Sequence, residues 1–105
     1  MNFKHCMIRT VIACGMTISL AAQAQDGAAL YASKACLACH GADANTPTTN
    51  VTPKLAGQNK AYLIQQLKDF KSGARNNGQS AQMAGIMGNV SEEEIEAIAE
   101  YLSGL

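Results

Sequence analysis

The stretch Cys36-Leu37-Ala38-Cys39-His40 decides how this chain of 105 residues is interpreted. Two cysteines three positions apart, with a histidine directly after the second, form the C-x-x-C-H pattern of covalent haem c attachment. On the last turn of a helix, each thiol can add across one vinyl group of a haem, and the neutral imidazole of His40 can bind the iron as its proximal ligand. We therefore expect Cys36 and Cys39 to anchor one haem c per chain.

Two other uses of a cysteine pair fit the remaining sequence less well. A thioredoxin-like redox disulfide expects a βαβ unit around the pair, and no alternating β-branched run follows residue 24. A zinc site needs four ligands. Beyond residue 24, the chain offers only Cys36, Cys39 and His40 as cysteine or histidine ligands.

Residues 1–24 have the layout of a secretory signal peptide. Lys4 and Arg9 precede an apolar run of twelve residues, and Ala22-Gln23-Ala24 is an A-x-A cleavage site. A membrane-spanning helix needs about 20 apolar residues, so the run is too short to span a bilayer. We predict cleavage after Ala24 and export to the periplasm, with no stable membrane insertion afterwards.

Two alternatives apply to this leader: an uncleaved anchor, and a lipoprotein in which Cys14 is lipidated.

Removal of residues 1–24 leaves 81 residues, which carry six Lys and Arg against eight Asp and Glu. So short a chain is marginal for a core made of side chains alone, and a buried apolar cofactor would supply hydrophobic mass. The lack of a basic stripe and the low aromatic content argue against nucleic-acid binding.

Residues 25–105 are expected to form a single all-α domain, with three to four helices and long loops wrapped around one covalent haem. Capping residues predict three helices: 26–39 with Asp26 as its N-cap, 60–72 between Asn59 and Gly73, and a last helix that begins with a Ser91–Glu94 capping box and ends at Gly104. Apolar periodicity predicts that the buried residues are Leu63, Leu67 and Phe70 in the second helix and Ile95, Ile98, Ala99 and Leu102 in the last one. Lys71 is expected on the solvated face of the second helix. The segment 41–57 has the composition of a long loop. The glycine-rich segment 82–89 is expected to be a methionine-bearing loop.

Candidates for the sixth iron ligand are limited to the residues that remain once His40 is the fifth. No second histidine follows the leader, and the only methionines there are Met83 and Met87. A thioether is a soft ligand that suits ferrous iron and raises the haem potential. Spacing alone does not rank the two methionines, because residues four apart share one face of a helix. A haem with both axial positions filled has no vacant position for a substrate, which indicates electron transfer.

Taken together, these motifs resemble those of a class I c-type cytochrome. The similarity is strongest to the small bacterial periplasmic single-haem kind, which is similar to one half of the di-haem cytochrome c4. The motifs that carry it are C-x-x-C-H at 36–40, Pro53-Lys54-Leu55-Ala56-Gly57-Gln58, Tyr62-Leu63, Gln66-Leu67, Met83, Val90-Ser91, Ile95, Ala99 and Tyr101.

The resemblance implies roles for single residues. It implies that Met83 is the ligating methionine, although Val90 stands where the family has a leucine. It implies that the carbonyl of Pro53 accepts a hydrogen bond from His40. It also implies that the first and last helices cross near Gly27, Tyr31 and Tyr101, and that one haem edge stays exposed. Candidate residues for that edge are Asp43, Lys54 and Lys60.

The sequence thus predicts a periplasmic electron carrier, not an enzyme, in a respiratory-type chain. Its partners would be redox proteins, such as membrane complexes, reductases or oxidases, and it would be a monomer or a weak dimer. One alternative is a haem enzyme or gas sensor with an open or labile sixth position. Another is a permanent subunit of a larger oxidase or reductase.

Overall fold

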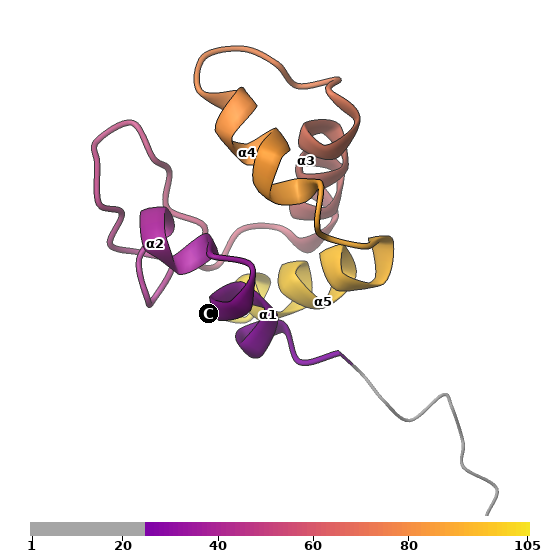
Figure 1. The fold of residues 1–105 in the computed structure, drawn as a ribbon. Helices are drawn as coiled ribbons and strands as arrows, with labels where there is room; N and C mark the ends of the chain where they lie inside the picture. Colours follow the sequence, from indigo (N-terminus) through magenta and orange to yellow (C-terminus); the bar gives the residue numbers. More distant parts are fainter. Residues whose placement is uncertain (1–24) are drawn as a thin grey trace, which may run out of the picture.

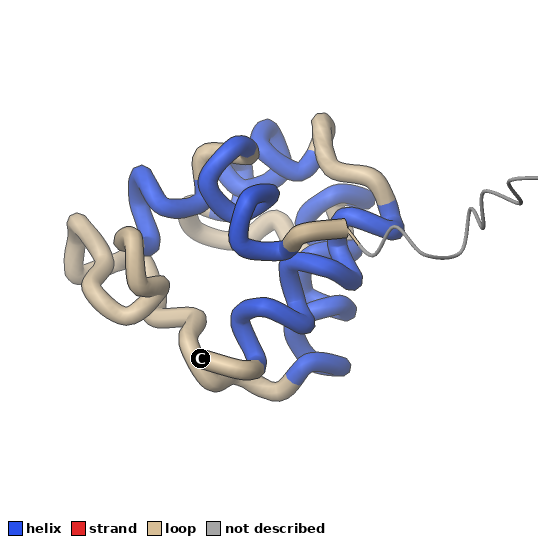
Figure 2. Tube along the Cα trace, turned by 90° about the horizontal axis from the view of Figure 1, so that it is seen from below, coloured by secondary structure: helices blue, strands red, loops and turns tan. Residues whose placement is uncertain are grey.

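The computed structural model describes residues 25–105, which form five helices and no strand (Figures 1 and 2). The helices are α1 (Gly27–Ser33), α2 (Cys36–His40), α3 (Lys60–Ser72), α4 (Ser80–Met87) and α5 (Glu92–Ser103). The all-α prediction is confirmed. The predicted signal peptide, with Cys6 and Cys14, lies outside the described residues. Within the described part of the chain, no helix combines the length and the apolar character needed to cross a bilayer.

The prediction of one continuous helix over 26–39 is wrong. Asp26 is the expected N-cap, because its carboxylate accepts from the N–H groups of the first turn, but α1 ends at Ser33. Ala35 adopts a left-handed conformation with φ of 64°. That conformation is uncommon for a residue with a side chain and breaks the helical hydrogen-bond ladder. The C-x-x-C-H motif therefore forms a short helix of its own, α2.

The methionine-bearing segment is a helix and not the expected loop. It forms most of α4, which packs against α3. Gly85 is the only glycine in the interior of α4, and Gly88 follows the last helical residue. One interior glycine costs about 1 kcal/mol of helix propensity, a cost that packing against α3 can offset. The break at Ala35 and this helix bring the number of helices to five, above the three to four expected.

The predicted ends of α3 and α5 are confirmed. Asn59 caps α3 by accepting from the N–H of Tyr62 at 3.0 Å. At the start of α5, Ser91 Oγ accepts from the N–H of Glu94 at 3.2 Å, and Glu94 Oε1 accepts from the N–H of Ser91 at 2.9 Å. These two reciprocal bonds are the expected capping box.

The predicted buried face of α5 is also confirmed. Its members are each at most 2% exposed, and they are Ile95, Ile98, Ala99 and Leu102. The predicted stripe on α3 is only partly core. Leu63 is buried, whereas Leu67 and Phe70 are only partly buried, and all three line a cavity.

Helices α1 and α5 cross in close contact, as the resemblance implied. The Tyr31 and Tyr101 rings lie 5.8 Å apart between centroids. A Cβ added to Gly27 would come within 2.1 Å of the carbonyl oxygen of Ala97. Only a glycine lets the two backbones approach so closely.

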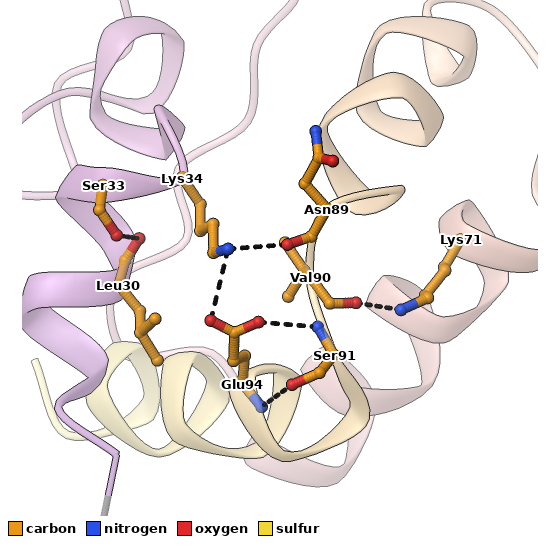
Figure 3. A network of polar contacts seen from close by, with 8 residues as sticks. All are labelled: Leu30, Ser33, Lys34, Lys71, Asn89, Val90, Ser91 and Glu94. Carbon is orange, nitrogen blue, oxygen red and sulfur yellow. Dashed lines mark hydrogen bonds and ion pairs between the residues drawn. The ribbon is translucent and has the colours of Figure 1, made fainter.

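A group of polar contacts fastens the connector between α4 and α5 (Figure 3). Lys34 Nζ donates to the carbonyl of Asn89 at 2.7 Å and pairs with Glu94 at 3.4 Å. From the other side, Lys71 Nζ donates to the carbonyl of Val90. The sequence placed Lys71 on the solvated face of its helix. In the structure it ties α3 to the connector that leaves α4.

Backbone hydrogen bonds hold the long segment between α2 and α3 in place. The N–H of Thr48 donates to the carbonyl of Cys39 at 2.9 Å, and the N–H of Leu55 donates to the carbonyl of Ala44 at 2.8 Å. Farther along, the N–H of Gly57 donates to the carbonyl of Leu102 in α5 at 2.8 Å. The loop is thus anchored at α2, within itself and at α5.

Gly27→Ala should destabilise the protein. The added Cβ meets backbone atoms of α5, so α1 must move, and overpacking of this kind costs about 1–3 kcal/mol. Urea denaturation of the haem-loaded protein measures the loss. Gly85→Ala is the control, because a Cβ there meets nothing within 4 Å and alanine favours the helix. Equal stability of Gly27→Ala and the parent would contradict the close crossing.

Glu94→Gln should weaken the polar contacts shown in Figure 3. It should also change how the free energy of unfolding falls as the pH is lowered. The hydrogen bond from the N–H of Ser91, with the nearby Lys34 charge, holds the pKa of Glu94 below its ordinary value of 4.5. A lowered folded-state pKa adds stability above the unfolded pKa, and that stability is lost as pH falls through the folded pKa.

The variant should therefore be less stable than the parent at neutral pH and should lose less stability as the solution is acidified. Denaturant midpoints at several pH values measure both effects. Glu93→Gln is the control, because Glu93 lies beside Glu94 but takes no part in the capping box or in the ion pairs of the described residues. If the stability of Glu94→Gln and that of the parent fell by the same amount on acidification, the result would count against this account.

Candidate functional site

The candidate site is a cavity of about 380 Å³, a size typical of cofactor and ligand sites. Its walls come from α2, the long loop after it, α3, the α3–α4 connector and α4. The five predicted site residues all line it, and they are Cys36, Cys39, His40, Pro53 and Met83. Residues up to 47 positions apart in sequence therefore meet around one space.

His40 is buried, with 5% of its surface exposed. Its Nδ1 lies 2.8 Å from the carbonyl oxygen of Pro53. A carbonyl oxygen can only accept, so Nδ1 carries the proton in this contact. The lone pair of the neutral ring then lies on Nε2, the nitrogen that is available to a metal ion.

The two cysteines are the first and fourth residues of α2, and neither forms a disulfide. Cys36 is partly buried and Cys39 is exposed. Burial raises the pKa of the Cys36 thiol, although its own backbone N–H acts in the opposite direction. In the haem-free chain, burial therefore favours the thiol form of Cys36 over the thiolate.

The two methionines lie in different environments, which their spacing did not predict. Met83 is partly buried and lines the cavity. Met87 is 1% exposed, belongs to the hydrophobic core and is not among the lining residues. Only Met83 therefore presents its side chain to the space that His40 lines.

Tyr31 supports the turn that follows α2. Its hydroxyl donates to the carbonyl of Gly41 at 2.6 Å. Burial, reinforced by neighbouring groups including Cys36, raises the pKa of Tyr31 to about 12, so the hydroxyl keeps its proton. Gly41 has φ of 91°, and a Cβ there would lie 2.3 Å from the carbonyl oxygen of Thr46. This turn needs glycine and leads the chain away from His40.

Several lining residues were not predicted as part of the site. One group of them consists of polar or aromatic side chains of α3 and the α3–α4 connector, which are Tyr62, Gln66, Phe70, Arg75, Asn77 and Gln79. Tyr62 and Gln66 belong to motifs that carry the family resemblance, but no site role was predicted for them. The sequence signals of the others were those of a helix face and a turn. Of the three candidates for an exposed edge, Lys54 lines the cavity. Asp43 and Lys60 do not, and Lys60 pairs with Glu100 at 2.7 Å.

The donors around this cavity fit a haem c. Two thiols three residues apart match its two points of covalent attachment. An imidazole with a free Nε2 and a thioether suit its iron. Among residues 25–105, no group of three or more histidine, cysteine or acidic side chains is arranged so that it could hold a metal ion, so these residues do not assemble a zinc site of their own.

Comparison with known proteins agrees with this site. The family model of cytochrome c matches residues 24–105. The chain is 41% identical over 98 residues to cytochrome c4 of Pseudomonas aeruginosa, a match that covers 92% of this chain and 46% of the relative. It is 39% identical over 85 residues to cytochrome c-553 of Nitratidesulfovibrio vulgaris, with 81% of each protein covered.

A solved structure, cytochrome c4 of Acidithiobacillus ferrooxidans, superposes with a TM-score of 0.66 at 35% identity, covering 80% of this chain and 50% of that one. The match thus spans about half the length of the cytochrome c4 relatives and most of cytochrome c-553. The fold and the similarity over nearly all of residues 24–105 lead to one conclusion: the chain belongs to the cytochrome c family and carries one covalently bound haem c.

Proposed function

We propose that this protein is a periplasmic one-electron carrier whose haem iron is held by His40 and Met83. The observation that carries the proposal is the lining of the cavity: it includes the buried imidazole of His40 and the thioether of Met83 and leaves out Met87. When bound, haem c supplies an iron that alternates between ferrous and ferric states.

In this proposal, Cys36 and Cys39 form the thioether links, and His40 is the proximal ligand. The contact between His40 Nδ1 and the Pro53 carbonyl orients the ring and strengthens Nε2 as a donor. Met83 would be the second protein ligand of the iron, and a thioether would give a higher potential than a second imidazole. If His40 and Met83 both held the iron, no position would be left open for a substrate, which suits electron transfer.

The chemistry of the remaining lining residues also supports electron transfer. Among the described residues that line the cavity, none is Asp or Glu, and His40 is the only histidine. Peroxide or substrate chemistry at a haem needs an acid or base positioned on the side opposite the proximal histidine. In this proposal, Met83 of α4 stands on that side, and a thioether is neither an acid nor a base. The polar ties around α4 (Figure 3) also favour a site that changes little between oxidation states.

Partners in this proposal are redox proteins that donate or accept one electron in a respiratory-type chain. Tyr62 is 51% exposed and Val51 is 63% exposed, and both line the cavity, as does Lys54. They provide a mixed apolar and cationic rim for a short-lived contact of the size seen for redox pairs, below about 1,200 Å². A monomer or a weak dimer would keep this rim accessible.

Met83→Leu should remove the distal ligand while keeping the volume of the side chain. The oxidised protein should lose the iron–sulfur charge-transfer band at the red edge of the spectrum, the reduced protein should bind carbon monoxide rapidly, and the potential should fall. Optical spectroscopy and a redox titration measure these effects. Met87→Leu is the matched control, and it should keep the band at a cost below about 1.5 kcal/mol of stability.

The opposite pattern, in which Met87→Leu loses the band and Met83→Leu keeps it, would exchange the roles of the two methionines. A parent protein that lacks the band and binds carbon monoxide at once would instead support a gas sensor or an enzyme with an open sixth position.

Export should remove residues 1–24. We expect the protein from a periplasmic extract to begin at Gln25 and to carry the mass of one covalently attached haem. Intact-mass spectrometry checks both points. Replacing Ala22 and Ala24 by bulky residues is the control, because it removes the A-x-A site and should block cleavage. Recovery of the parent with residues 1–24 still attached would contradict the signal peptide.

A further inference from the structure

The connector between α3 and α4 contains an Asn77–Gly78 pair, which is the only asparagine–glycine step in the chain. Both residues are exposed, and both line the cavity. A side-chain amide followed by glycine is open to attack by the next backbone nitrogen, because glycine has no Cβ to obstruct the approach. Neither residue has a part in the electron transfer proposed above.

The backbone nitrogen of Gly78 is free to react. Among the hydrogen bonds of residues 25–105, none has the N–H of Gly78 as its donor. Gly78 has φ of 55°, and a Cβ placed there would meet no atom within 4 Å. A backbone nitrogen in a helix would first have to give up its hydrogen bond, whereas this one has none to lose.

Ser80, the first residue of α4, holds the amide that would be attacked. Its Oγ donates to Asn77 Oδ1 at 3.3 Å, and its N–H donates to the main-chain carbonyl of Asn77 at 3.0 Å. Ser80 is only 6% exposed, so the packing of α4 fixes both donors. A donor at a carbonyl oxygen stabilises the negative charge that develops there when a nucleophile adds to the carbon.

The remaining asparagines of residues 25–105 lack this combination, because each precedes a residue that carries a side chain; they are Asn45, Asn50, Asn59, Asn76 and Asn89. Asn76 is the closest comparison. It is exposed and lies in the same connector, but it precedes Asn77 and does not line the cavity. The chain therefore provides a matched internal control one residue away.

We propose that Asn77 is a site of spontaneous deamidation in the folded protein, with Ser80 as its positioning residue. The Gly78 nitrogen loses its proton to water and forms a bond to Asn77 Cγ. The side-chain nitrogen takes up a proton and leaves as ammonia, which gives a cyclic imide. One water then adds to either carbonyl of the imide and opens it, so position 77 becomes aspartate or isoaspartate. The net reaction consumes one water and releases one ammonia.

This modification places a carboxylate in a cavity wall that has none. No Asp or Glu is among the described residues that line the cavity, and a new carboxylate there is ionised at neutral pH. A negative charge near a haem iron favours the ferric state, so the potential should fall as the protein ages. This effect rests on the haem-binding part of the proposed function, whereas the deamidation itself does not.

The first test follows the reaction in the haem-loaded parent, Gly78→Ala and Ser80→Ala. Each protein is kept at mildly alkaline pH in water enriched in oxygen-18, and peptide mass mapping then locates the label. One oxygen of water enters the product, so the label marks deamidation that occurs during the incubation. Alanine is tolerable at position 78, because Ala35 and Ala44 adopt φ of 64° and 55° in this protein.

In the folded parent, label should enter position 77 about tenfold faster than Asn76, and part of the product should be isoaspartate. Gly78→Ala should slow labelling at position 77 to about the rate at Asn76, because a methyl group then obstructs the attack. Ser80→Ala should slow it about fivefold, because one hydrogen bond to the reacting carbonyl is lost.

The second test compares redox titrations of Asn77→Asp and Asn76→Asp with the parent. Both variants add one negative charge to the same connector, but only position 77 lines the cavity. Asn77→Asp should lower the equilibrium constant for reduction about two- to threefold, the effect of one unit charge through a partly aqueous path. Asn76→Asp should change it less.

Label that enters position 77 only after the parent is unfolded in urea would overturn the assignment, because the fold would then protect the amide. Equal labelling of Asn76 and Asn77 would also overturn it, and labelling of Ser80→Ala at the parent rate would overturn the role of Ser80. If Gly78→Ala does not fold, the comparison of the two asparagines in the parent decides.

Equal potentials in Asn77→Asp and Asn76→Asp would overturn the effect on the haem and leave the labelling result valid. The iron–sulfur charge-transfer band is recorded in parallel. Its absence from the parent would count against Met83 as a ligand and would not alter the outcome of the labelling.

Discussion

The contact between His40 Nδ1 and the carbonyl of Pro53 is the constraint on which the site depends. It fixes the tautomer of the imidazole and aims the other nitrogen into the cavity. It also joins the end of the C-x-x-C-H helix to a loop thirteen residues farther along the chain. The hydrogen bonds from Thr48 to Cys39 and from Gly57 to Leu102 hold that loop in place, so the orientation of the ligand follows from the packing of the loop.

The helices divide into a part that supports the domain and a part that borders the haem. The α1–α5 crossing, with Gly27 against Ala97 and the two tyrosine rings in contact, forms a tight core without the cofactor. Helices α2 and α4 border the cavity, and the polar contacts in Figure 3 fasten α4 to the rest. In a domain this small, the haem provides the apolar mass that would complete the core.

The charges around the cavity have a consistent arrangement. The acidic side chains of α5 that form ion pairs meet lysines outside the cavity, and acids are absent from the described cavity wall. The cavity wall instead carries Lys54 and Arg75. A cavity wall of this kind suits a cofactor that carries carboxylates of its own.

The sequence by itself determined the haem motif, the helix caps at Asp26, Asn59 and Ser91, and the buried face of α5. These depend on spacing over a few residues, which the chain carries locally. It did not determine the break at Ala35, the helical form of α4 or the place of Arg75 in the cavity wall. Only the tertiary structure decided that Met83 faces the cavity while Met87 joins the core. The reason is physical: residues four apart share a helix face, and the packing of α4 against its neighbours selects which of them reaches the cavity.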